Sequence, residues 1–180
     1  MYPLALVALA AALLGLWMAT TQPQEADFLR TTQAESHAAN FWAYHQALVA
    51  YQNDNFQTAN GIIPDAVLTA PNPPKRPNGY APLGYTVMKT TELLPVSLWK
   101  NTIEGGRLYT YSSIPASNLP AGTLDAIANY QGSSLMIGIR QGAYIKTQFE
   151  LDTPPYTTTG TRYTSFPTQI PEGALVVVGN

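Results

Sequence analysis

The first nineteen residues of the chain carry no charge and almost no polarity. They read MYPLALVALAAALLGLWMA, and no charged side chain occurs before Glu25. Nineteen helical residues rise about 28 Å, close to the thickness of the hydrocarbon core of a bilayer. A buried helix of a soluble domain normally has a polar face, which this run lacks. The run therefore predicts a membrane anchor over residues 1–21, with an apolar surface that includes Leu4, Leu13, Leu14, Leu16 and Trp17.

A cleaved signal peptide is the main alternative for this run. Such a peptide usually starts with basic residues and ends with small residues at a cleavage site. Here no Lys or Arg precedes the apolar run, and Ala19-Thr20-Thr21 is a poor cleavage site. We therefore favour an uncleaved, single-pass anchor, with residues 22–180 forming one domain outside the cytoplasm, which is the periplasm if the chain is bacterial.

A second, amphipathic helix is predicted to begin at the junction formed by Pro23. Proline fits the first turn of a helix, and the acidic Glu25 and Asp27 are favourable near the positive end of the helix dipole. Between residues 27 and 51, apolar residues recur at spacings of three, four and seven. The resulting stripe, predicted to pack on a sheet of the same domain, consists of Phe41, Tyr44, Leu48 and Tyr51.

The remainder of the chain favours a small antiparallel sheet. Turn residues are dense, and short alternating or β-branched runs lie between them. The predicted elements are strands at 85–88, 107–112 and 174–178, a hairpin of 135–140 with 143–146, and a short helix at 123–130 capped by Thr123. The fold class is therefore α+β, with an N-terminal transmembrane helix continuing into an amphipathic helix that packs on the sheet, and one short extra helix.

Charge is scarce throughout the chain, at 11% of residues, against roughly a quarter in an average soluble domain. Nine Lys/Arg oppose eleven Asp/Glu, and the longest basic run is the pair Lys75-Arg76. Clustered positive charge, which a nucleic-acid surface needs, is absent from the sequence. We therefore expect no nucleic-acid partner, and the many Tyr residues favour protein docking instead.

The histidines do not form a metal motif. His37 and His45 are eight residues apart, about 80° out of alignment on a helix, unlike the i, i+4 pair of known zinc motifs. The sequence has no cysteine that could add a ligand. We therefore expect solvated or partner-facing histidines, and neither a metal nor a cofactor.

The sequence also lacks a convincing catalytic motif. Ser97 and Lys100 match an SxxK pattern, but the companion KTG motif is missing, since Lys146-Thr147 is followed by Gln148. The isolated acids Asp125, Glu150 and Asp152 are expected to be solvated. We therefore predict no catalytic residue and no small-molecule substrate, and keep a periplasmic hydrolase or ligand-binding protein as an alternative.

Several apolar and aromatic segments resemble a known family. They are LALVALAAALLGLW near the start, residues 41–51, Asn60-Gly61-Ile62-Ile63, and residues 94–99. They are similar to PilM-type proteins of the type IVb thin pilus systems of conjugative plasmids, and the layout resembles that of pilins and pseudopilins. The resemblance implies a single-pass inner-membrane accessory protein for pilus biogenesis, with a pilin-like periplasmic domain that binds other pilus assembly proteins and has a role in conjugation. It leaves homo-oligomerisation open.

The start of the chain departs from that of processed pilins. These carry a basic leader, a Gly before the cut and a Glu five residues into the mature helix, and residues 1–19 contain none of these features at the matching places. We therefore expect neither processing by prepilin peptidase nor polymerisation as a major pilin. A minor pilin or pseudopilin incorporated in the fibre stays an alternative.

Overall fold

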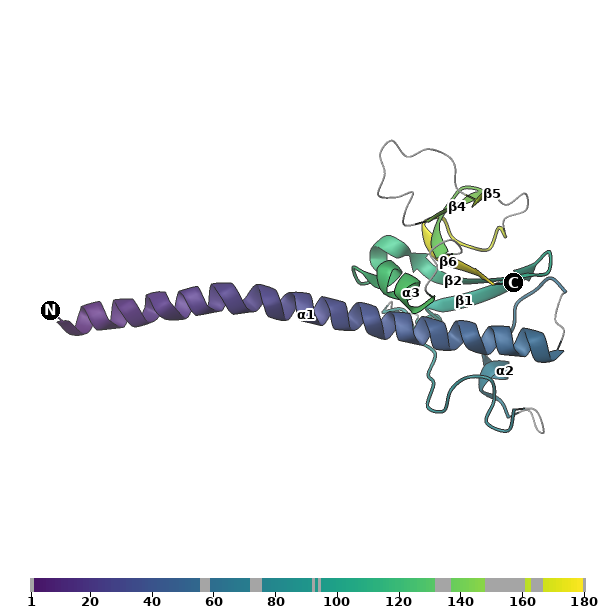
Figure 1. The fold of residues 1–180 in the computed structure, drawn as a ribbon, viewed down its shortest axis with the longest axis horizontal. Coiled ribbons are helices and arrows are strands. Elements are labelled where there is room, and N and C mark those ends of the chain that lie inside the picture. Colours follow the sequence, from purple (N-terminus) through teal and green to yellow (C-terminus); the bar gives the residue numbers. More distant parts are fainter. Residues whose placement is uncertain are drawn as a thin grey trace.

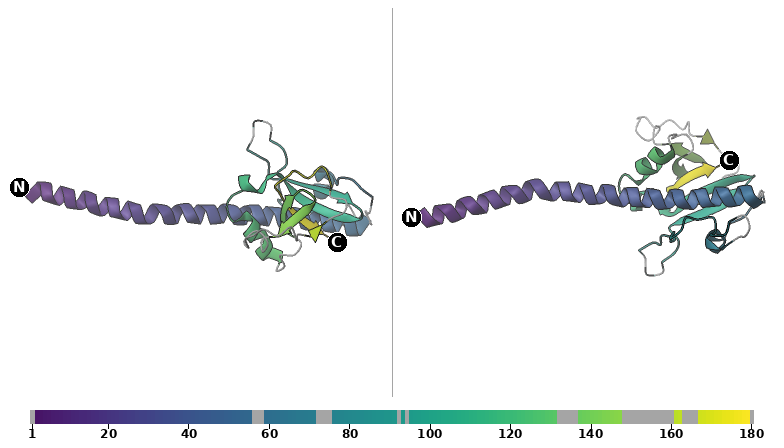
Figure 2. Two further views of the ribbon diagram at one scale, coloured as in Figure 1. Left: turned by 90° about the horizontal axis from the view of Figure 1, so that it is seen from above. Right: turned by 60° about the horizontal axis from the view of Figure 1, so that its bottom comes forward.

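The fold consists of one long helix with a small α+β domain packed along its C-terminal half (Figure 1). The computed structural model describes residues 2–55, 59–71, 76–91, 93, 95–131, 137–147, 161–162 and 167–179, with the side chains of 2–24, 26, 131, 147, 161 and 162 left out. The long helix, α1, spans Tyr2–Asn55. At 1.5 Å per residue its length is about 80 Å. Its N-terminal half extends away from the domain, and the C-terminus of the chain lies beside its other half (Figures 1 and 2).

The helix continues through Pro23, so the prediction that a second helix begins there is wrong. A proline inside a helix removes one hydrogen bond and crowds the preceding turn, at a cost of about 3 kcal/mol. Good helix formers, mostly Ala and Leu before it and Gln, Glu and Ala after it, offset this cost. Pro23 therefore lies within one gently curved helix (Figure 1), and so does the predicted border after residue 21.

Among the residues that the structure describes, no helix combines the length and the apolar character needed to cross a membrane. The predicted anchor residues lie on α1, but their side chains are outside the described part; they are Leu4, Leu13, Leu14, Leu16 and Trp17. The membrane anchor stays a prediction.

Six antiparallel strands form a single sheet, which confirms the α+β class and the antiparallel sheet. The strands are β1 (Trp99–Glu104), β2 (Arg107–Pro115), β3 (Ile137–Gln141), β4 (Tyr144–Thr147), β5 (Thr161–Arg162) and β6 (Ala174–Gly179). Their order in the sheet is β1-β2-β6-β3-β4-β5. The last strand therefore lies in the interior of the sheet, as its continuous apolar sequence predicted.

The apolar run of β6 is buried because both faces of the sheet are covered. Leu175 and Val177 belong to the cluster that includes the α1 side chains. Val176 and Val178 belong to a second cluster on the other face, together with Tyr109 and other residues of β2 and β4. Alternate side chains of one strand therefore enter two cores.

Two sequence-based assignments differ from the structure. Residues 85–88 form no strand; an isolated bridge joins Lys89 to Ser97 instead. The described part of the domain has two short α-helices rather than one, α2 (Asp65–Thr69) and α3 (Thr123–Gln131), in addition to a 3-10 turn at Ala116–Asn118. A helix as short as α2 is shorter than the windows in which helical periodicity can be recognised.

The predicted packing stripe lies on the side of α1 that meets the domain. Phe41, Tyr44 and Leu48 are fully buried and belong to the core cluster that contains Trp99 of β1. Tyr51 is half-buried, and its ring lies edge-on to the ring of Tyr80 with centroids 5.2 Å apart. The first three positions therefore pack into the core under the sheet, and the fourth packs on the loop that follows α2.

Candidate functional site

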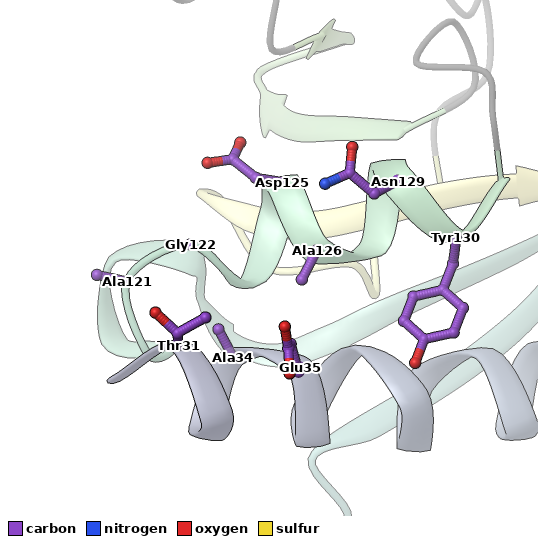
Figure 3. Close-up of a pocket in the computed structure, with 9 residues that line it drawn as sticks. All are labelled: Thr31, Ala34, Glu35, Ala121, Gly122, Asp125, Ala126, Asn129 and Tyr130. Carbon is purple, nitrogen blue, oxygen red and sulfur yellow. The ribbon is translucent and has the colours of Figure 1, made fainter. Parts of the chain in front are cut away.

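A groove of about 500 Å³ runs between α1 and α3 (Figure 3). Its floor is made of small residues, which are Ala34 of α1 and Ala121, Gly122 and Ala126 at the start of α3. Gly122 has φ of 85°, a conformation that favours glycine, and a Cβ there would lie 3.8 Å from that of Ala34. The glycine therefore allows the chain to turn into α3 directly above α1.

Two hydrogen bonds fix α3 in this position. The indole N–H of Trp42 donates to the Ile127 carbonyl, 2.9 Å away, in the buried contact between the two helices. The Thr123 hydroxyl donates to the Pro120 carbonyl at 2.6 Å. Thr123 therefore binds the preceding loop. The prediction that its side chain caps a free N–H of α3 is wrong.

The rim of the groove is acidic and aromatic. Glu35 of α1 and Asp125 of α3 are exposed carboxylates, and none of the nine residues lining the groove is basic. Tyr130 is 60% exposed, and its ring is directed from α3 toward α1, whereas the Asp125 side chain is directed away from α1 (Figure 3). The two helices thus place negative charge and one aromatic ring around a cavity with a floor of small residues.

Exposed apolar side chains continue this surface toward the N-terminus of α1. Phe28 is 70% exposed and Leu29 is 60% exposed. Phe28 precedes Glu35 by seven residues, so the two side chains lie on the same face of the helix. Large exposed apolar residues beside a groove are typical of protein interaction surfaces.

A second cavity, of about 230 Å³, adjoins a buried hydrogen-bond network. Asn101 Nδ2 donates to the Tyr44 phenol oxygen and to the Ile63 carbonyl. The Ile63 N–H donates to Asn101 Oδ1, and the donor–acceptor distance of each of these three bonds is 2.8 Å. The Tyr44 hydroxyl donates to Asp65 Oδ1 at 2.8 Å, and Ser97 Oγ donates to Asp65 Oδ2 at 2.9 Å. Burial raises the pKa of Tyr44 well above its usual range, so its proton stays in the network. The network ties α1, α2 and β1 together.

The SxxK residues line this second cavity but do not pair with each other. Ser97 donates its hydroxyl hydrogen bond to Asp65, and Lys100 is exposed on β1. Within the described part of the chain no hydrogen bond joins Ser97 to Lys100. A nucleophilic serine needs a neighbouring base that removes its proton. The geometry therefore places Ser97 in the structural network without bringing Lys100 to it.

The prediction of solvated histidines is wrong for His45. This residue is only 6% exposed, its Nδ1 and Thr110 Oγ1 share a hydrogen bond of 2.8 Å, and its ring stacks on Phe41. Burial lowers its pKa from 6.5 to about 4, so it is neutral in the core at ordinary pH. Its spacing from Phe41 and Leu48, four and three residues, was the signal in the sequence that placed it on the packed face.

His37 is less buried than His45 and is bonded within its own helix, where its Nδ1–H donates to the Gln33 carbonyl at 2.8 Å. Among the described residues, no group of three His, Cys, Asp or Glu side chains is placed to hold a metal ion. Of the acids singled out in the sequence, Asp125 is exposed at the groove, and Glu150 and Asp152 are outside the described residues.

Comparison with known proteins identifies the family. The PilM family model matches residues 8–178. No curated protein sequence matches the chain. The crystal structure of PilM from Escherichia coli B7A has the same fold, with a TM-score of 0.50 and 15% identity over 83% of this chain and 93% of that one. Because the family match spans nearly the whole chain, the protein belongs to the PilM family of pilus systems, and its role is pilus-related.

Proposed function

We propose that the protein is a non-enzymatic accessory factor for type IV thin-pilus biogenesis, held in the bacterial inner membrane by residues 1–21 with residues 22–180 in the periplasm. One observation carries this proposal. The N-terminal half of α1 extends beyond the folded domain (Figure 1). The first nineteen residues of the chain are uncharged and mostly apolar. Apolar surface of this length needs a lipid or protein environment, and family membership supplies the pilus context.

The non-enzymatic part of the proposal is supported by the two cavities. The second cavity, of about 230 Å³, is lined by Ser97 and Asp65, which are held in hydrogen bonds to each other and to Tyr44. The groove beside α3 has carboxylates, but no Ser, Cys, His or Lys is among its lining residues. The proposed activity is therefore binding of other pilus assembly proteins.

The anchor is tested by fractionating cells that express either the full chain or a variant lacking residues 2–21. The full chain should sediment with membranes and resist alkaline extraction. Its domain should become accessible to protease once the outer membrane is permeabilised. The truncated variant should be extractable at neutral pH. Recovery of the full chain in the soluble fraction would contradict the anchor.

The pilus role is tested in a host carrying the pilus system. Removing the gene should abolish thin pili and plasmid transfer in liquid mating, and the full chain should restore both. Normal pili without the protein would contradict the assembly role. A pull-down of the membrane-embedded full chain should recover components of the pilus platform.

A minor pilin incorporated in the fibre is the second candidate. It is favoured by the continuity of α1 through Pro23, because a single long helix could pack into a helical fibre core. Protein found in sheared pili would support this candidate, and exclusive retention in the membrane would oppose it.

A hydrolase is tested by replacing Ser97 and Lys100 with Ala. Under our proposal this double variant assembles pili normally. Loss of a hydrolytic activity with intact pili would favour the enzyme instead.

A further inference from the structure

We draw no further inference here: the strongest candidate, the surface formed by the groove between α1 and α3 and the exposed apolar side chains of Phe28 and Leu29 on α1, carries none because nothing in the structure shows what covers it.

Discussion

The two halves of α1 have one backbone conformation but different surroundings. Between Ala34 and Leu48 the helix is lined with buried side chains that enter the core of the domain. A few residues earlier, Phe28 and Leu29 are largely exposed, and the helix continues away from the domain (Figure 2). The same secondary structure is thus stabilised by tertiary packing between Ala34 and Leu48, whereas at Phe28 and Leu29 it leaves large apolar side chains exposed.

This difference shows that helical structure and burial are separate properties of the sequence. An isolated helix in water is only marginally stable, and tertiary packing of an apolar face normally supplies the remainder. In the C-terminal half that packing partner is the sheet. Before Ala34, the described apolar side chains of Phe28 and Leu29 are exposed, and the uncharged, apolar start of the sequence agrees with the proposed membrane anchor.

The largest expected effect comes from removing a ring in the packed half. Phe41→Ala should lower the free energy of unfolding by about 3–5 kcal/mol, because it leaves a cavity under the sheet. Phe28→Ala, the matched change in the exposed half, should change it by less than about 0.5 kcal/mol. Thermal or denaturant unfolding measures both. A Phe41→Ala variant that melts like the wild type would mean that the stripe faces a partner and not the core.

The next effect concerns the network that holds the packed half of α1 to β1. Asn101→Ala removes one of the two hydrogen-bond partners of Tyr44, which keeps Asp65, and the partner of both backbone groups of Ile63. Leaving buried polar groups unsatisfied should cost about 2–4 kcal/mol. Asn53→Ala, at an exposed position of α1, is the control and should be nearly neutral. Equal stability of the two variants would show that the network contributes nothing.

Acidic pH should weaken the packed half through His45. Its folded pKa is about 4 and its ordinary value 6.5, so the unfolded chain binds the proton first as the pH falls. Stability is therefore complete above pH 6.5 and declines toward pH 4, by about 2–3 kcal/mol near the lower end. Unfolding measured across this range should show a flatter profile for His45→Gln than for the wild type. Parallel profiles for the two proteins would exclude this role of His45.

The smallest effect is expected from shortening the exposed half. Removal of residues 2–21 should change the unfolding free energy of the domain by less than about 0.5 kcal/mol, because the described core begins at Ala34. The same truncation is expected to abolish membrane association. A large loss of domain stability would mean that the projecting half folds back on the domain.

Periodicity and local propensity predicted much of the fold. The stripe of Phe41, Tyr44 and Leu48, the position of α3 and the buried β6 were all readable, because each depends on a repeat within one element. Of strand β1 only the start at Trp99 and Lys100 was readable as a strand entry, because the buried residues that follow include Asn101 and Thr102, whose polarity hides the pattern. The hydrogen bonds that make Asn101 compatible with burial come from residues far away in the sequence.

The groove was less predictable than the fold. Asp125 was singled out only as an isolated acid, and nothing in the spacing of Glu35 and Asp125 indicates that they share a rim. They line the same groove because Gly122 turns the chain and Trp42 binds α3. For His45 the sequence predicted the helix on which the residue lies, but it did not predict that the side chain is buried under the sheet.

The sequence alone determined the class of the protein, because apolar periodicity, charge scarcity and an uncharged start are properties of the chain itself. It also contained the segments that carry the family resemblance. Tertiary structure decided that His45 is buried and neutral, that Asn101 is buried, and that two acids and a tyrosine line one groove. These features depend on contacts between residues distant in sequence, whose energies outweigh the local preferences of histidine and asparagine.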